Sequence, residues 1–286
     1  MIMYKDIFVP SRLSPNLQRP KLILYLNNLK LNKEEDMDCP YCNSNDIKIF
    51  KTKTNLGYLQ YFCRDCCHQY NERTGTKFNF IELPNEVVML AVYYYYKFKV
   101  SLDNVVELMA IRGLYLSHQT VHNWVQTFGV EIGMKLRTRR KGQSGNKWHT
   151  DATYVKIPGN WCYLYRAIDR EGNLVDVYLS DTRDQVAAEN FFKQAKVTTN
   201  ITPIQITTDK EPALYPAINN VFPDVKHRDS KYKNNIIEQN HRGIKSRYKV
   251  MKGFKSPFSA LIFCTVFEKI RQLHRAKDES EQCAEA

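Results

Sequence analysis

The chain has 286 residues, of which 43% are hydrophobic, so it has enough apolar side chains for folded cores and is not an intrinsically disordered protein. Its 42 Lys and Arg residues exceed its 30 Asp and Glu residues, giving a net charge of +12. This balance points to a polyanionic partner, with nucleic acid favoured over an anionic membrane surface. No run of 18 apolar residues and no signal-peptide pattern is present, so we expect a cytoplasmic protein that does not bind membranes.

Residues 1–37 form an N-terminal segment to which we assign no function, although residues 22–26 have the composition of a short helix or strand. Residues 38–80 carry two CxxC pairs, separated by 20 residues, whose cysteines are Cys39, Cys42, Cys63 and Cys66. Each pair presents two thiolates, and two pairs complete a tetrahedral site. Residues 47–53 and 58–62 read as a β-hairpin between the pairs. We therefore predict a zinc ribbon.

The predicted Zn²⁺ is structural, because four thiolates leave no position for water. Cys67 and His68 are alternative ligands with poorer spacing, and four ordinary buried cysteines are the alternative interpretation. The basic residues of this module suit contact with DNA or with protein, and the sequence does not choose between them.

Residues 81–134 are predicted to form three helices, which begin near Pro84, Ser101 and Ser117. The last two, joined by a turn at Gly113, have the pattern of a helix-turn-helix. A polar face of the third helix offers amide and imidazole groups that suit base edges in a major groove: His118, Gln119, His122, Asn123 and Gln126. The alternative is a plain three-helix packing unit.

Residues 135–147 are a basic linker. It contains Arg137, Arg139, Arg140 and Lys141 and no acidic residue. Contact with phosphates is the functional interpretation, and a solvated tether is the alternative.

Residues 148–272 change to a mixed pattern. Strands are predicted at 148–157, 161–169, 174–179, 204–208 and 225–228, and helices at 184–197, 211–222 and 233–251. The order β-β-β-α-β-α-β-α predicts an α/β fold of the ribonuclease-H-like type, a mixed sheet with helices on both faces. Residues 273–286 are a polar tail.

In such a fold, Asp151, Asp209 and Glu238 come from three separate elements and converge at one end of the sheet. A set of this kind holds two Mg²⁺ ions, for which Mn²⁺ can substitute, about 3.5–4 Å apart for phosphodiester chemistry. Taken singly, each acid is as well explained as a strand-end or turn residue.

The helix at 233–251 has two faces. Ile237, Ile244, Tyr248 and Met251 form the face predicted to be buried. Glu238, Arg242, Lys245 and Lys249 form the other, where one acid opens a cationic stripe suited to a metal beside phosphates. The alternative is a solvated face with a weak Glu238–Arg242 pair.

The stretches WHTDATYVKI, ITTDKEPALYPAI and HRDSKYKNNIIEQNHRGIKSRYKVMKGFKS, with LSHQTVHNWVQTF before them, resemble the DDE transposases of the insertion-sequence-six family. The resemblance covers residues 78–272. It implies that Asp151, Asp209 and Glu238 are the metal-binding catalytic triad, and that the basic run of His241, Arg242, Lys245 and Arg247 contacts the DNA backbone. Ala152 stands where the family usually has Glu, but strand neighbours point to opposite faces, so we expect activity to be kept.

The resemblance implies a metal-dependent DNA strand transferase. It would bind the terminal inverted repeats of an insertion sequence and a target DNA, assemble as a homodimer or larger on synapsis, associate with the nucleoid, and use no small-molecule substrate. One alternative is a non-catalytic DNA-binding regulator or a domesticated inactive transposase. A tyrosine recombinase using Tyr248 is less favoured, because it would leave the three carboxylates without a role.

Overall fold

The computed structural model describes residues 38–138, 144–157, 159–209, 211–229 and 235–273. The segment at 22–26, Arg139, Arg140, Lys141 and the polar tail from 274 lie outside this range. The chain divides into two compact units, residues 1–93 with 109–115 and residues 94–108 with 116–286. The predicted division at residues 38–80, 81–134, 135–147 and 148–272 remains a prediction.

The first unit contains a small antiparallel sheet. Its strands are β1 (Ile47–Lys53), β2 (Leu59–Cys63) and β3 (Gln69–Asn71), in the order β1-β2-β3. The predicted hairpin is confirmed, with Gly57 supplying a positive φ of 86° in its turn. The core of this sheet consists of Cys39, Cys63, Tyr61 and Tyr70.

Three helices begin where they were predicted to begin: α2 (Asn85–Lys97), α3 (Leu102–Ala110) and α4 (His118–Thr138). α4 continues to Thr138, into the segment 135–147 that was predicted to be a linker. The serines predicted to begin the last two do so. The Asn104 amide donates to Ser101 Oγ at 3.2 Å, and the Thr120 amide donates to Ser117 Oγ at 3.0 Å. α2 and α3 contribute residues to both units.

The second unit is built on a five-stranded mixed sheet. Its strands are β4 (Lys147–Ile157), β5 (Asn160–Asp169), β6 (Leu174–Ser180), β7 (Gln205–Thr208) and β8 (Lys226–Asp229). The order is β6-β5-β4-β7-β8, with β4, β5 and β6 antiparallel and β7 and β8 parallel to β4. This mixed α/β arrangement is the predicted ribonuclease-H-like sheet.

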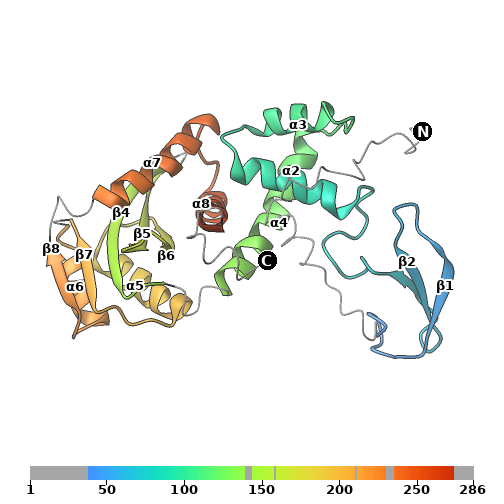
Figure 1. Ribbon diagram of the computed structural model, residues 1–286, viewed down its shortest axis with the longest axis horizontal. Coiled ribbons are helices and arrows are strands. Elements are labelled where there is room, and N and C mark those ends of the chain that lie inside the picture. The colour runs from blue at the N-terminus through green and yellow to red at the C-terminus, as the bar shows by residue number, and fades with distance from the viewer. Residues whose placement is uncertain (1–37, 139–143, 158, 210, 230–234, 274–286) are drawn as a thin grey trace. The chain divides into compact units, whose positions relative to one another are not determined.

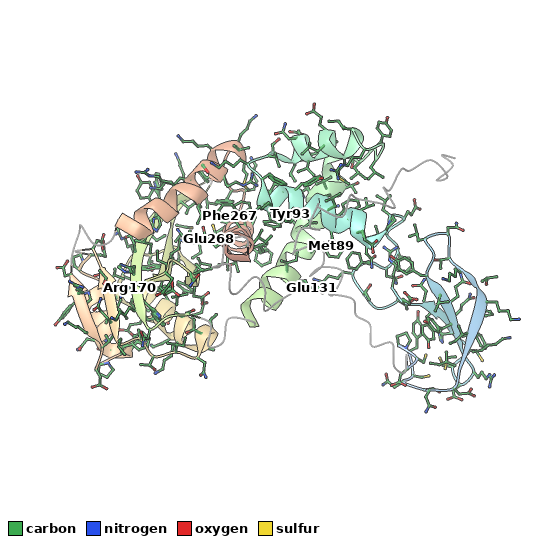
Figure 2. All side chains as sticks on the ribbon, viewed as in Figure 1. Met89, Tyr93, Glu131, Arg170, Phe267 and Glu268 are labelled. Atoms are coloured by element: carbon green, nitrogen blue, oxygen red, sulfur yellow. The ribbon has the colours of Figure 1, made fainter. Side chains whose placement is uncertain are left out.

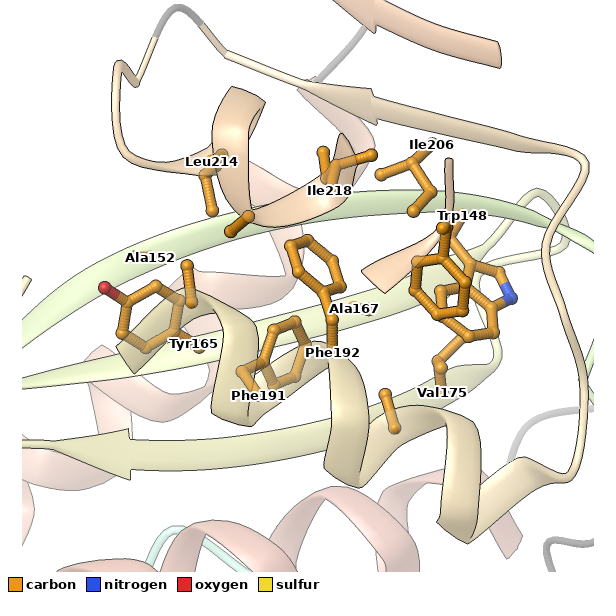
Figure 3. Close-up of a cluster of buried hydrophobic side chains, with 14 of the residues drawn as sticks. Trp148, Ala152, Tyr165, Ala167, Val175, Phe191, Phe192, Ile206, Leu214 and Ile218 are labelled. Carbon is orange, nitrogen blue, oxygen red and sulfur yellow. The ribbon is translucent and has the colours of Figure 1, made fainter. Parts of the chain in front are cut away.

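One face of the sheet is covered by α5 (Gln185–Thr199) and α6 (Leu214–Val221) (Figure 3). The Asp184 carboxylate begins α5 by accepting from the Ala187 amide at 2.8 Å. Tyr165 stacks on Phe191, and the rings of Trp148 and Phe222 make a T-shaped contact. These fully buried rings fix both helices, since burial of one large apolar side chain contributes about 1.5–3 kcal/mol.

Two further helices belong to this unit: α7 (Asn235–Val250), which contacts β4, and α8 (Pro257–Leu273), which contacts β6 and α4 (Figure 1). α8 was not predicted from the sequence. It carries Phe267 and Glu268 (Figure 2), and Glu268 meets Arg166 of β5. Tyr165 and Ala167 belong to the core between the sheet and the helices α5 and α6. Because successive side chains of a strand point to opposite faces, Arg166 points to the other face, which α8 covers.

Candidate active site and cysteine cluster

Two of the predicted catalytic acids come from neighbouring parallel strands. Trp148 pairs with Ile206 and His149 with Thr207 in the β4–β7 register. Continuing this register along both strands brings Asp151 beside Asp209, at the point where β7 ends. Because neighbouring strands lie about 4.8 Å apart, both carboxylates belong to one end of the sheet. Carboxylate oxygens are the ligands that Mg²⁺ prefers, so this pair fits a divalent metal.

The Asp151 side chain is 15% exposed and lies against α7. Its Oδ1 accepts a hydrogen bond from the Ala152 amide at 2.7 Å, and its Oδ2 lies 3.8 Å from Nδ1 of His241. Burial, with the charges of Arg166 and Lys245, lowers the pKa of His241 to about 2. The imidazole is therefore neutral, and this contact is not an ion pair.

The neighbour of Asp151 points the other way, as predicted. Ala152 is 7% exposed and packs in the core under α5 and α6. A residue at this position faces away from Asp151, so the departure from the family pattern falls outside the acid pair.

The turn after β7 is held by local contacts. Asp209 Oδ1 accepts from the Glu211 amide at 3.2 Å, and Thr208 Oγ1 lies 2.8 Å from Nε2 of His227. Glu211 pairs with Arg183 at 2.5 Å. These contacts fix where the second carboxylate leaves the strand.

Glu238 lies in the first half of α7, and the structure describes only its backbone. It precedes His241, the residue that contacts Asp151, by three positions, or about 4.5 Å along a helix. Positions three apart share one side of a helix. The backbone of the third acid is therefore within one helical turn of His241, the residue that contacts the first acid.

The described part of α7 has the two predicted faces. Ile237 and Ile244 are buried, whereas Arg242, Lys245 and Lys249 are exposed. Two members of the basic run differ from expectation. His241 is 4% exposed and Arg247 is fully buried.

The guanidinium of Arg247 donates to the carbonyl oxygens of Tyr95, Phe98 and Val100 and is not available to DNA. His241 lies against Asp151 and is not on the exposed stripe. His241 follows Ile237 by four residues and Arg247 follows Ile244 by three, so both lie on the buried face of the helix. This helical period was the sequence signal that could have predicted their burial.

The predicted recognition face of α4 is partly open. His118, Gln119 and Asn123 are exposed, and His122 and Gln126 are half-buried. Gln119 Nε2 donates to Asn123 Oδ1 at 2.7 Å, which holds the two amides side by side. For Arg137 the structure describes only the backbone.

The four predicted zinc ligands come together. The sulfur of Cys39 lies 3.4 Å from that of Cys66, that of Cys42 lies 3.5 Å from that of Cys63, and all four lie within 4.8 Å of one another. Tetrahedral Zn–S bonds of about 2.3 Å require sulfurs about 3.8 Å apart, so the cluster fits Zn²⁺. The backbone amide of Cys66 lowers the pKa of Cys63 to about 7, whereas burial raises the pKa of Cys66, so the four thiols of the cluster do not ionise alike.

The alternative ligands have other contacts. Cys67 is exposed and donates to the carbonyl of Arg64 at 3.8 Å. His68 bonds through Nδ1 to the Cys66 carbonyl at 2.9 Å and stacks on Tyr41. The structure thus groups the cysteines that have the CxxC spacing.

Residues 145–277 match the model of a family described as "DDE domain". Over 175 residues the chain is 36% identical to the transposase for insertion sequence-like element IS431mec of Staphylococcus aureus (strain Mu50), covering 59% of this chain and 77% of the relative. The chain belongs to the insertion-sequence-six family of DDE transposases. It is thus a metal-dependent enzyme by family.

The transposase for insertion sequence element IS257 in transposon Tn4003, also from Staphylococcus aureus, matches this transposase with the same identity and coverage. Among solved structures, the HTLV-2 integrase catalytic core domain in complex with magnesium is 19% identical, with a TM-score of 0.35, over 44% of this chain and 86% of that chain. In the parts of this transposase that the structure describes, no helix is long and apolar enough to cross a membrane.

Two charged residues near the acids were not singled out from the sequence. Arg166 is fully buried and pairs with Glu268, which is 4% exposed, at 2.7 Å. Arg166 is also the direct cross-strand partner of Asp151. Directly paired residues point to the same face, so this ion pair lies beside the site.

Proposed function

We propose that this transposase binds the terminal inverted repeats of an insertion sequence and catalyses Mg²⁺-dependent cleavage and strand transfer. The observation that carries the proposal is the parallel β4–β7 register, whose continuation brings Asp151 beside Asp209, together with the position of Glu238 one helical turn before the residue that contacts Asp151. The three carboxylates would hold two Mg²⁺ or Mn²⁺ ions. When bound, such ions activate a water or 3′-OH nucleophile and stabilise the leaving oxygen of an in-line displacement.

The chain's own residues then position the DNA. His241 contributes a neutral imidazole beside Asp151, which adds no positive charge to compete with a metal. The exposed Arg242, Lys245 and Lys249 take phosphates along α7. Neutralised phosphates release counterions, so binding weakens steeply with salt.

A helix-turn-helix formed by α3 and α4 would read the terminal repeat. His118, Gln119 and Asn123 present donors and acceptors to base edges, with His122 and Gln126 at the margin of this surface. The linker residues Arg137, Arg139, Arg140 and Lys141 would add phosphate contacts. Two DNA ends must be joined in one reaction, so we propose a homodimer or larger assembly acting on DNA in the cytoplasm.

Residues 38–80 would be a zinc ribbon. Its four cysteines fit Zn²⁺ with no open ligand position, so the ion holds the fold of β1–β3 and takes no part in catalysis.

The test is strand transfer of labelled element ends by the purified protein with Mg²⁺. Wild type should join ends to target DNA, and Glu238→Gln, Asp151→Asn and Asp209→Asn should not. Asp224→Asn is the matched control, because this exposed acid lies at the other end of the sheet, just before β8. Equal joining by wild type and Glu238→Gln contradicts the proposal. Tight binding of the repeats without joining by wild type favours a non-catalytic regulator.

A further inference from the structure

Two large aromatic side chains lie exposed side by side at the end of the β4–β5 hairpin. Tyr154 is 59% exposed and Trp161 is 50% exposed. Their ring centroids are 5.2 Å apart, with the planes at 80°. Scattered exposed apolar residues are ordinary, but an adjoining pair of this size presents a continuous ring surface.

The pair is exposed because the hairpin extends beyond the rest of the sheet. β7 pairs with β4 only over Lys147–His149, and β6 begins to pair with β5 only at Tyr163. Among the residues that the structure describes, no further strand of the sheet flanks the tip of the hairpin, which is therefore a two-stranded ribbon. Isolated two-stranded ribbons are marginal in water, so this one needs support from elsewhere.

α7 supplies that support and places cations over the rings. The Tyr248 hydroxyl donates to the Lys156 carbonyl at 2.8 Å, which ties the helix to the ribbon. Lys245 Nζ lies 5.6 Å from the Tyr154 ring centroid, and Lys156 Nζ lies 5.6 Å from that of Trp161. The sequence has no acidic residue from 152 to 168, so the surface is positively charged.

The aromatic pair lies close to the acid cluster. His241, which contacts Asp151, and Lys245, which contacts Tyr154, are four residues apart on α7, about 6 Å along its axis. Tyr154 follows Asp151 by three residues, about 10 Å along β4, and shares the face of Ala152, so the rings and the Asp151 carboxylate lie on opposite faces of the strand. Lys245 reaches Tyr154 from α7, the helix that also contacts Asp151. A DNA strand that passes from the acids around the edge of β4 beside Lys245 therefore brings its unpaired nucleotides to the rings.

We propose that Tyr154 and Trp161 form a stacking platform for unpaired bases of DNA adjacent to the reacting phosphodiester. Ring faces flanked by ammonium groups match the two parts of a single strand, bases and phosphates, whereas paired bases in a duplex have no free faces to offer. The inference rests on the proposed function, because it takes the acid cluster to be the place where DNA reacts.

The test compares two labelled substrates of one terminal-repeat sequence, one fully duplex and one with unpaired nucleotides at the reacting end. Trp161→Ala and Tyr154→Ala should weaken binding of the unpaired end by about 5- to 150-fold, the range for loss of one base–aromatic stack, and leave duplex binding nearly unchanged. Trp161→Phe should recover most of the loss. Tyr215→Ala, which removes a 64% exposed ring on α6, is the control and should change neither.

A second measurement needs no variant. Trp124 and Trp148 are buried, so quenching of the exposed Trp161 by an unpaired oligonucleotide reports stacking directly. Equal loss of binding to both substrates, no loss with either, or a changed oligomeric state with unchanged DNA binding would overturn the platform. If Glu238-dependent strand transfer persists in those cases, only the platform fails; loss of strand transfer in wild type with stacking intact removes the proposed function instead.

Discussion

The buried Arg166–Glu268 pair offers a sharp test of what holds α8 on the sheet. Its two charged groups lie 2.7 Å apart, with side chains 0% and 4% exposed. Glu268→Gln keeps the shape of the side chain but removes the counter-charge, which leaves a buried guanidinium uncompensated. Breaking a buried pair in this way costs about 3–5 kcal/mol.

This cost translates into a measurable melting shift. For units of 150–250 residues, 1 kcal/mol corresponds to about 2–4 °C, so Glu268→Gln should lower Tm by roughly 6–20 °C. Circular dichroism of the protein as purified, without added Mg²⁺, measures it. The control is Lys193→Gln on α5, which breaks the Lys193–Glu189 contact of 3.4 Å. Lys193 is 61% exposed, so no measurable change is expected.

The double variant Arg166→Met/Glu268→Met tests whether the loss of stability comes from the unpaired charge. With both charges gone, an apolar pair of similar volume should restore most of the lost stability, because the penalty comes from the unpaired charge. A double variant as unstable as the sum of the two single substitutions would refute this account. So would a Tm for Glu268→Gln that matches wild type.

Three further predictions concern His241, Arg247 and the cysteines. His241 has a pKa of about 2 in the folded protein, below its ordinary value of 6.5. Between these values only the unfolded chain binds the proton, so the free energy of unfolding falls by about 1.4 kcal/mol for each unit by which the pH is lowered well below 6.5. Urea titrations at several pH values should show a weaker dependence of this free energy on pH for His241→Leu than for wild type, and an equal dependence contradicts the burial. Arg247→Met should destabilise the protein by at least about 2 kcal/mol, because three carbonyl groups lose a charged donor, yet leave the salt dependence of DNA binding unchanged. Arg242→Gln, at an exposed position, should leave stability nearly unchanged but reduce the slope of log binding constant against log salt concentration by about 0.9. Freshly purified protein should contain one zinc per chain by mass spectrometry, and Cys63→Ser should lose it and the fold of β1–β3; zinc near zero in wild type contradicts the ribbon.

Local pattern was sufficient for most elements of this transposase. Alternating residues predicted β4, and the turn before residue 161 predicted β5, each to within one residue. Ser101, Ser117 and Asp184 marked helix starts, and the structure shows their side-chain oxygens bonded to backbone amides. α8 escaped prediction because it is buried on two sides, between α4 and the sheet, so it lacks an amphipathic stripe. β3 has three residues, too few to show a period.

The candidate site divides in the same way. The acids and cysteines were found because metal chemistry restricts both residue type and spacing. The role of Arg247 was not, because its carbonyl acceptors lie far away in sequence, 149 residues in the case of Phe98. The family motif alone predicted that Arg247 contacts DNA. The fold shows instead that its guanidinium donates to backbone carbonyl groups of the same chain.

The separation of exposed cations from buried anchoring residues on α7 bears on catalysis. The exposed cations lie on one side of the helix, and the anchors Ile244, Arg247 and Tyr248 are concentrated in its second half. Glu238 lies nine residues before Arg247, about 14 Å along the axis, so the anchor fixes the direction of the helix that carries the third acid. Arg247→Lys keeps the charge but not the planar fork that reaches several carbonyl groups. If the anchor positions Glu238, this variant loses strand transfer more than it loses binding of the terminal repeat, and strand transfer in proportion to binding would show that the anchor serves stability alone.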